Sequence, residues 1–305
     1  MSPKISVCLA TYNPRQDYLA KTLEGARKQT LPHDQWEFLL IDNASQPPLE
    51  GRISLSGLPQ GRIVVEKEPG LSHARRRAFQ EAKGDMIVNL DDDAILDAKY
   101  LEVCLRLAIQ YPFIGVFGSQ IIAEFEEDPI WPKKEYYAAE RTVHEDIWSN
   151  DREHIPSTPW GAGSVVRKAV ADAYVKKISE DLRWGQLGRT AEKLLSCEDI
   201  EIAMTACDLG LGKGVFRDLK FRHLIPKSKM TEDFLCKNAY GNGYSFTIHN
   251  WLRFGRLPPK PSLLGRINRS YRLFRMSRRR RKQESAKDKG VQEAVDFIRS
   301  KNLLK

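Results

Sequence analysis

The sequence predicts an α/β fold in which helices flank a mainly parallel central sheet. Over the first 120 residues, short apolar runs of the kind found in buried strands alternate with amphipathic helical patterns. That alternation is typical of parallel sheets, because each crossover between parallel strands usually contains a helix. Acidic residues directly follow two of the apolar runs, and ligands of such sheets gather at the carboxyl ends of the strands.

The strands of this first half are predicted from uninterrupted apolar or β-branched runs, and its helices from apolar residues that recur every three or four positions. The strand runs cover residues 5–10, 38–41, 63–65, 86–90 and 114–118. Helical spacing covers residues 18–26, 71–82 and 101–108, and the turn Pro69-Gly70 opens the second of these helices.

The second half begins with an irregular stretch. Residues 124–159 are acidic and aromatic without a period, which predicts a long surface excursion that is functional or mobile. Regular patterns then return as a strand near 160–166, a short helix from Lys168, a helix over 199–207 that Gly210 ends, and short strands at 215–216 and 219–221. A mostly helical stretch over 231–251 and a Pro-rich linker over 257–261 follow.

The net charge of +9 comes from one segment. The whole chain holds 49 Lys and Arg against 40 Asp and Glu. Residues 260–282 contain ten of the basic residues and no acid, which leaves 39 basic against 40 acidic residues, a net charge of −1, elsewhere. A body this close to neutral has no general basic face, so no nucleic-acid partner is expected.

The cysteines and the N-terminal residues indicate a cytoplasmic protein. The five cysteines are widely spaced and form no C-x-x-C pair, so neither a disulfide framework nor a zinc site is expected. The apolar run over 5–10 is too short for the core of a signal peptide, and no window of about 18 apolar residues could span a membrane.

The most informative local feature is Asp91-Asp92-Asp93, directly after a predicted buried strand. Three adjacent carboxylates repel one another unless a cation lies among them, and their hard oxygens suit Mg²⁺ or Mn²⁺ bound together with phosphate groups of a ligand. In an extended loop, Asp91 and Asp93 point to one side and Asp92 to the other. A solvated acidic turn, or a cap on a following helix, is the alternative.

Five more residues stand where they could join such a site. Asp42, after the second strand, could accept an N–H of a nucleotide base, and Arg75 could face that base or a phosphate. Glu198-Asp199 opens a helix, where a carboxylate could take a proton from an attacking hydroxyl. His223 follows a strand and could bind the same metal. Each also has an ordinary explanation, as a turn residue, helix surface, helix cap or structural histidine.

Together, six segments closely resemble the family 2 glycosyltransferases, which have a GT-A fold. The segments are ISVCLATYN at 5–13, LIDNAS at 40–45, GLSHAR at 70–75, NLDDD at 89–93, WGAG at 160–163 and CED at 197–199. Six segments in the right order are far more specific than any one of them. With this resemblance we expect a glycosyltransferase domain over 1–225, with a donor half at 1–120 and an acceptor half at 121–225. A helical extension over 226–259 and a basic amphipathic tail over 260–305 would follow.

The resemblance implies a donor site and a metal site. Thr11 and Tyr12 lie where the family's first loop touches the nucleotide. Asp42 matches the carboxylate that reads the base, and Arg75 matches the arginine that supports the base or the diphosphate. Asp91 and Asp93 are the two ends of the D-x-D element, with Asp93 favoured as the direct metal ligand and Asp92 placed beside the nucleotide. His223 matches a histidine that binds the metal in several relatives.

It also implies an acceptor site. Asp199 matches the catalytic base of the E-D motif, and Glu198 orients it or contacts the acceptor. Two positions depart from the family pattern: Arg76, where many relatives carry Asn, and Ala78, where Gly is frequent.

The implied reaction is a single inverting displacement on a nucleotide-sugar, with UDP favoured and guanine also compatible with Asp42. Mn²⁺ or Mg²⁺ would neutralise the departing diphosphate. The acceptor would be a hydroxyl of a glycan or a lipid-linked molecule, in surface polysaccharide or glycoconjugate synthesis. A sugar-nucleotide nucleotidyltransferase is the second class, but its Gly-rich loop with a lysine is replaced here by ATYNP at 10–14. A nucleotide- or RNA-binding protein is the third, but the tail contains no recognisable RNA module.

The tail has a pattern of its own. Leu264, Ile267, Tyr271 and Phe274 recur at helical spacing, and arginines recur at every third residue through the same stretch. Such a helix could lie on an anionic bilayer, here the inner face of the cell membrane. Packing on the catalytic domain, with the arginines in solvent, is the alternative. Three tryptophans, Trp131, Trp148 and Trp160, could stack on sugar rings or pack in the core.

Overall fold

The computed structural model describes residues 3–136, 139–181, 183–184, 196–259 and 262–300. These residues form two compact units, which are described separately. The first unit contains the described residues up to 184 together with Glu198–Pro226. The second contains Ser196, Cys197 and the described residues from Lys227 onward. Residues 260–261 of the predicted linker and the last five residues of the predicted tail lie outside the described part.

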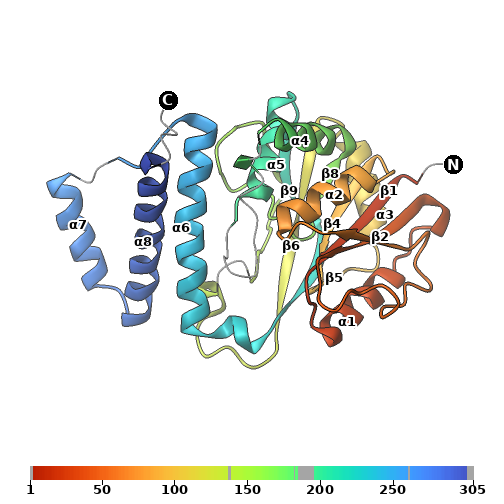
Figure 1. The fold of residues 1–305 in the computed structure, drawn as a ribbon, viewed down its shortest axis with the longest axis horizontal. Helices are drawn as coiled ribbons and strands as arrows, with labels where there is room; N and C mark the ends of the chain where they lie inside the picture. The colour runs from red at the N-terminus through yellow and green to blue at the C-terminus, as the bar shows by residue number, and fades with distance from the viewer. Residues whose placement is uncertain (1–2, 137–138, 182, 185–195, 260–261, 301–305) are drawn as a thin grey trace. The chain divides into compact units, whose positions relative to one another are not determined.

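The first unit is built on one sheet, confirming the predicted α/β class (Figure 1). Within the described residues the sheet has nine strands, in the order β3-β2-β1-β4-β8-β6-β9-β5, with β7 paired to β9. The strands are β1 (Ile5–Thr11), β2 (Trp36–Asn43), β3 (Arg62–Glu66), β4 (Met86–Asp91), β5 (Ala94–Leu96), β6 (Ile114–Phe125), β7 (Ile147–Ser149), β8 (Val165–Arg167) and β9 (Gly212–Ile225). The β3-β2-β1-β4 segment and the β6-β9 pair are parallel.

Helices cover the sheet, which explains the uninterrupted apolar runs of β1, β2 and β4. The helices of this unit are α1 (Gln16–Arg27), α2 (Leu71–Glu81), α3 (Tyr100–Gln110), α4 (Lys168–Glu180) and α5 (Glu198–Asp208), with short 3₁₀ turns at His33–Gln35 and Lys133–Glu135. Helices α2, α4 and α5 pack beside one another, whereas α1 packs against β5 and α3 against β9 (Figure 1). Strands buried on both faces lose the polar alternation of a half-exposed strand.

The parallel register brings the predicted donor residues to one edge of the sheet. Thr11, at the end of β1, lies opposite Asp42 near the end of β2. On the other side of β1, Ala10 lies opposite Asp91, the last residue of β4. Three adjacent strands therefore end together, and the loops that follow them share one site.

Strand β9 differs from the sequence expectation. The two short strands expected at 215–216 and 219–221 are parts of one strand that pairs with β6 along its length. The register shifts between the pairs Ser119 to Phe216 and Gln120 to Lys220, so β9 bulges in between. The exposed Arg217 and Asp218 lie in this bulge, and their polar side chains interrupt the apolar pattern that marks the rest of the strand.

The second unit consists of helices. They are α6 (Glu232–Phe254), α7 (Leu263–Phe274) and α8 (Arg278–Ser300), after a 3₁₀ turn at Lys227–Met230. Helix α6 is capped by Thr231, whose hydroxyl accepts the Phe234 N–H at 3.2 Å. The described helices contain no segment long and apolar enough to cross a membrane.

The predicted tail is two helices rather than one. Helix α8 packs along α6, and Gly243 allows the close approach because a side chain there would meet the Lys287 backbone carbonyl. Ala294, Val295 and Ile298 are the apolar residues that α8 buries. The last part of the basic run, from Arg278, begins α8.

Candidate active site

A buried ion-pair cluster centred on Arg75 joins the two predicted halves of the site. Arg75 lies in α2 and is 3% exposed. Its Nη1 lies 2.6 Å from Glu198 Oε1, at the start of α5, and its Nη2 lies 3.6 Å from Asp91 Oδ1, at the end of β4. The guanidinium of Arg75 thus contacts both the first aspartate of the acidic triplet and the first residue of the Glu198-Asp199 motif.

The charges around Arg75 keep it protonated. Burial lowers the pKa of an arginine, but the negative charges of Glu198, Asp91 and Asp199 outweigh that effect, so the pKa of Arg75 is raised. The cluster places one fixed positive charge among three carboxylates. The surplus of negative charge is suited to a further cation.

The loop 160–164 is shaped by the same arginine. At Gly161, a Cβ would lie 2.5 Å from Arg75 Nη2, so a larger residue would displace the guanidinium. The Gly161 N–H donates to Asp199 Oδ2 at 2.9 Å. Gly161 therefore makes room for Arg75 and at the same time holds the predicted base.

Residues outside the predicted set fix this loop. Gly163, at a φ of +65°, donates its N–H to the Asn89 carbonyl at 2.8 Å. Its own carbonyl accepts hydrogen bonds from the hydroxyls of Tyr100 and Ser119. Asn89 precedes the acidic triplet, so β4 positions both the triplet and the loop that holds Asp199. No local sequence pattern marks Tyr100 and Ser119, which come from α3 and β6.

Asp199 lies in the first turn of α5 and is partly exposed. Its two oxygens accept backbone N–H groups, Oδ1 from Ile200 at 2.8 Å and Oδ2 from Gly161 at 2.9 Å. Both bonds fix the orientation of the carboxylate at the start of the helix. The arrangement suits a base that is held in one orientation and can be reached by a ligand.

The three aspartates of the triplet have different partners. Asp91 faces Arg75, as described above. Asp92 accepts a hydrogen bond from the Thr11 hydroxyl, and its backbone carbonyl accepts one from the Thr22 hydroxyl at 3.1 Å. Asp93 Oδ2 lies 3.6 Å from His223 Nε2. The β5–β9 pairing, in which Ala94 lies opposite His223, brings that histidine to the triplet.

Asp93 and His223 are the predicted metal ligands that the structure brings together. Among the described residues, no group of three or more His, Cys, Asp or Glu side chains is close enough to hold a metal ion by itself. A carboxylate and an imidazole nevertheless form a donor set that suits Mn²⁺, and a bound diphosphate could supply further oxygens. Asp91, the third predicted ligand, is in contact with Arg75, and its binding of a metal stays a prediction.

Asp42 holds a loop at the donor end of the site. It is 1% exposed, and its two oxygens accept the backbone N–H groups of Ser45 at 3.0 Å and Leu49 at 2.9 Å. Asn13 connects this loop to the end of β1, because its Oδ1 accepts the Gln46 N–H at 2.8 Å. The contact of Asp42 with a nucleotide base stays a prediction. Tyr12, in contrast, is 44% exposed and presents its ring to solvent.

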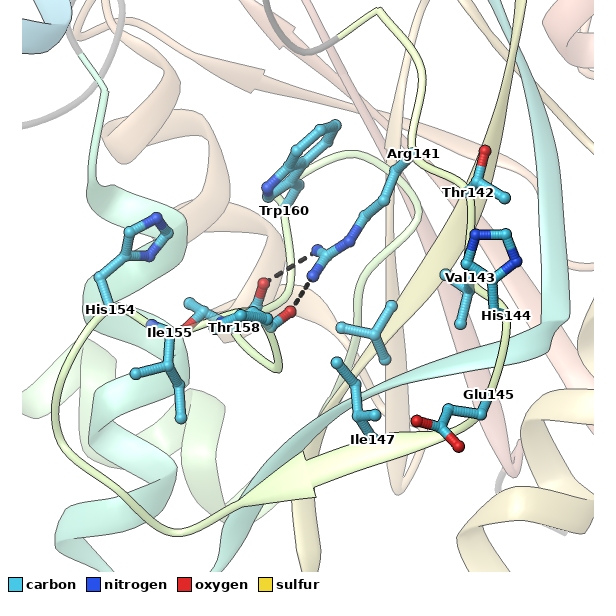
Figure 2. A pocket seen from close by; sticks show the side chains of 12 residues that line it. Arg141, Thr142, Val143, His144, Glu145, Ile147, His154, Ile155, Thr158 and Trp160 are labelled. Carbon is cyan, nitrogen blue, oxygen red and sulfur yellow. Dashed lines mark hydrogen bonds between the residues drawn. The ribbon is translucent and has the colours of Figure 1, made fainter.

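A pocket of about 570 Å³ lies next to the acceptor motif in the first unit (Figure 2). It is lined by residues from 141 to 160 and by Val215 of β9. Trp160, directly before Gly161, forms part of its wall. Much of the irregular stretch at 124–159 is therefore the wall of this pocket.

Comparison with known sequences identifies the family. The sequence model described as glycosyl transferase family 2 matches residues 6–174, which is more than half of the chain. An uncharacterized glycosyltransferase of Bacillus subtilis, YwdF, is 29% identical over 169 residues, which make up 55% of this chain and 60% of YwdF. The putative teichuronic acid biosynthesis glycosyltransferase TuaG of the same organism is 26% identical over 151 residues, 48% of this chain and 58% of TuaG. The aligned part thus spans about three fifths of each relative.

Comparison with solved structures supports the fold. The mannosyltransferase PcManGT from Pyrobaculum calidifontis, solved in complex with GDP-Man and Mn²⁺, superimposes with a TM-score of 0.56 at 17% identity. The match covers 98% of this chain and 76% of PcManGT.

The ion pair between Arg75 and Glu198 should be strongly coupled. We expect Arg75→Met to lower the free energy of unfolding by about 3–5 kcal/mol, because it leaves the buried Glu198 carboxylate without its cation. Adding Glu198→Gln to Arg75→Met should recover part of that loss, because the unpaired charge is then removed as well. Urea denaturation of the two single variants and the double variant measures the coupling. Strictly additive losses would show that the two side chains do not depend on each other.

Proposed function

The chain belongs to glycosyl transferase family 2 and is a glycosyltransferase, and we propose that its first unit transfers the sugar of a UDP-sugar to a hydroxyl of a glycan or lipid-linked acceptor. The reaction is a metal-dependent displacement with inversion at the anomeric carbon, in the synthesis of a surface polysaccharide or glycoconjugate. One observation carries the proposal: buried Arg75 contacts Asp91 on the donor side and Glu198 on the acceptor side, so both motifs serve one site.

The donor binds at the carboxyl ends of β1, β2 and β4 in this proposal. The exposed ring of Tyr12 offers a stacking surface for the base, and the loop held by Asp42 and Asn13 borders it. The competing nucleotide is GDP, which the PcManGT complex carries as GDP-Man. Asp93 and His223 hold a divalent cation, whose charge would stabilise the departing diphosphate.

Asp199 acts as the base. Its carboxylate accepts the proton of the acceptor hydroxyl as the oxygen attacks the anomeric carbon and the bond to the diphosphate breaks. The hydrogen bonds from Gly161 and Ile200 fix the orientation of the carboxylate before the acceptor arrives. Glu198 is paired with Arg75, so it positions the start of α5 rather than accepting the proton.

Replacing the base should abolish transfer without abolishing donor binding. We expect Asp199→Asn to lower the transfer rate by about 100-fold or more, the usual contribution of a general base. Calorimetric titration with UDP and Mn²⁺ should give the same affinity for the variant and the unchanged enzyme, because Asp199 does not contact the donor. Asp208→Asn, at the other end of the same helix, is the matched control and should keep full activity. Full transfer by Asp199→Asn would exclude the assignment.

Metal dependence is tested on Asp93. Adding Mn²⁺ should strengthen UDP binding by the unchanged enzyme, and Asp93→Asn should remove most of that gain, because an amide is a weaker metal ligand than a carboxylate. The same titration with GDP identifies the preferred base. Asp97→Asn, an exposed residue after β5, serves as the control. An equal Mn²⁺ effect in the Asp93 variant would contradict the metal assignment.

The second unit attaches the enzyme to an anionic membrane surface in this proposal. Helix α7 leaves five large apolar side chains between 59% and 79% exposed, namely Leu263, Leu264, Ile267, Tyr271 and Phe274. Exposed arginines of the same segment, among them Arg272 and Arg275, flank them. An apolar stripe flanked by cations matches the interface of a bilayer that contains acidic lipids.

The attachment depends on the apolar stripe. Ile267→Ser combined with Phe274→Ser should reduce sedimentation with phosphatidylglycerol vesicles by roughly 100-fold, because burial of two such side chains contributes about 3 kcal/mol or more. Ile109→Ser, which removes an exposed apolar residue from α3, should leave sedimentation unchanged. Equal sedimentation of the unchanged enzyme with phosphatidylglycerol and with neutral phosphatidylcholine vesicles would rule out an anionic surface as the partner.

A further inference from the structure

The pocket beside the acceptor motif contains one arginine without a carboxylate partner. Arg141 is held to β6 by a backbone bridge to Ile121, and its side chain reaches the segment 156–158. Its guanidinium donates to the backbone carbonyls of Thr158, at 2.9 Å, and Pro156 (Figure 2). A guanidinium has five N–H donors, so three remain for a ligand. Within the described part of the chain, no Asp or Glu forms an ion pair with it.

The charge of Arg141 persists although the residue is half-buried. Burial lowers the pKa of Arg141 to about 10, and the nearby negative charge of Asp199 only partly offsets the effect. A pKa of about 10 still leaves the side chain protonated at neutral pH. The one carboxylate of the pocket wall, Glu145, is exposed and lies away from Arg141 in Figure 2. A half-buried cation that forms no ion pair attracts an anion more strongly than a fully exposed one.

Beside Arg141, the pocket contains an aromatic ring, that of Trp160. Its ring centroid lies 5.0 Å from the Arg141 guanidinium, and both side chains line the pocket. Three apolar residues, Val143, Ile147 and Val215, complete this wall. An aromatic ring beside a cation suits a sugar ring that carries a negative group, because the ring packs on the aromatic face while the anion meets the guanidinium.

The pocket lies near the proposed base, because the negative charge of Asp199 acts on Arg141 in the pocket wall. Trp160 is followed by Gly161, whose N–H donates to Asp199. The loop that carries Trp160 therefore connects the pocket wall to the carboxylate that would accept the proton of an acceptor hydroxyl.

We propose that this pocket binds an acidic glycan acceptor, with its carboxylate or phosphate group against Arg141 and a sugar ring on Trp160. This inference rests on the proposed glycosyl transfer, since it names the acceptor class of the same site. Arg141 is a specificity-determining residue: it touches the acceptor and takes no part in the bond changes at the anomeric carbon.

The test uses pairs of trisaccharides that differ only in charge. One pair is trigalacturonic acid and its fully methyl-esterified form, and the other is maltotriose 6-phosphate and maltotriose. Binding to the full chain is measured by calorimetry in the presence of UDP and Mn²⁺. The acidic member of at least one pair should bind about tenfold or more tightly, the value of one charge-assisted hydrogen bond. The pair that shows the difference identifies the anion as carboxylate or phosphate.

Three variants assign the preference to Arg141. Arg141→Gln should bring the binding ratio close to one, and Arg141→Lys should keep part of the preference because it keeps the charge. Arg106→Gln removes an arginine outside the pocket wall and should keep the full preference. Binding of UDP with Mn²⁺ by each variant shows that it is folded, and if Arg141→Gln does not fold, the ratio of the unchanged enzyme still decides.

Equal binding of the charged and neutral members of both pairs, or no binding of any, overturns the proposal, as does an unchanged preference in Arg141→Gln. These failures are distinct from failure of the proposed function. Intact UDP binding without charge discrimination rejects only the acidic acceptor. Charge discrimination without any binding of UDP or transfer from a UDP-sugar would keep the acidic-glycan site and reject the proposed reaction.

Discussion

The buried contact of Arg75 with Glu198 and Asp91 is the constraint on which the rest of the site depends. These residues come from α2, α5 and the end of β4, so the cluster fixes three elements relative to one another. Removing any charge from water is costly, and the cost is offset only when opposite charges and hydrogen bonds are well placed. The close packing around the guanidinium explains why the 160–164 loop carries glycine at position 161, where any side chain would displace Arg75.

Backbone N–H groups hold two carboxylates of the site in place. Asp42 and Asp199 each accept two of them, and in both residues the donors come from short segments that the fold must first position. The two sites differ in exposure: Asp42 is buried and fixes a loop, whereas Asp199 is partly exposed. The same chemistry thus gives one aspartate a structural task and leaves the other accessible for chemistry. Asp42 and Asp199 accept the same number of hydrogen bonds, so that number does not distinguish the two roles. The exposure of the two residues to solvent does distinguish them.

The sequence predicts the strands and the edge of the sheet where the site lies, because buried parallel strands have an unambiguous apolar pattern and strand ends in a parallel sheet meet. It does not predict contacts that depend on packing between distant segments. Arg75 pairs with Glu198, 123 residues away, and no local pattern marks such a pair. Tyr100 and Ser119 are missed for the same reason. The two strands expected within β9 are one, because its bulge interrupts the pattern without ending the pairing.

The net charge of the chain does not describe the charge near the proposed site. The whole chain carries +9, the segment 260–282 accounts for all of it, and the remaining residues sum to −1. A nearly neutral body nevertheless contains a cation at Arg141 that has no carboxylate partner within the described residues, and a surplus of acid around Arg75. Binding of an anion is decided by such local imbalance, because a half-buried charge is screened far less than an exposed one. In the proposed enzyme, attraction to a membrane would depend on many exposed charges, whereas selection of an acceptor would depend on one half-buried charge. The two properties would therefore be separate.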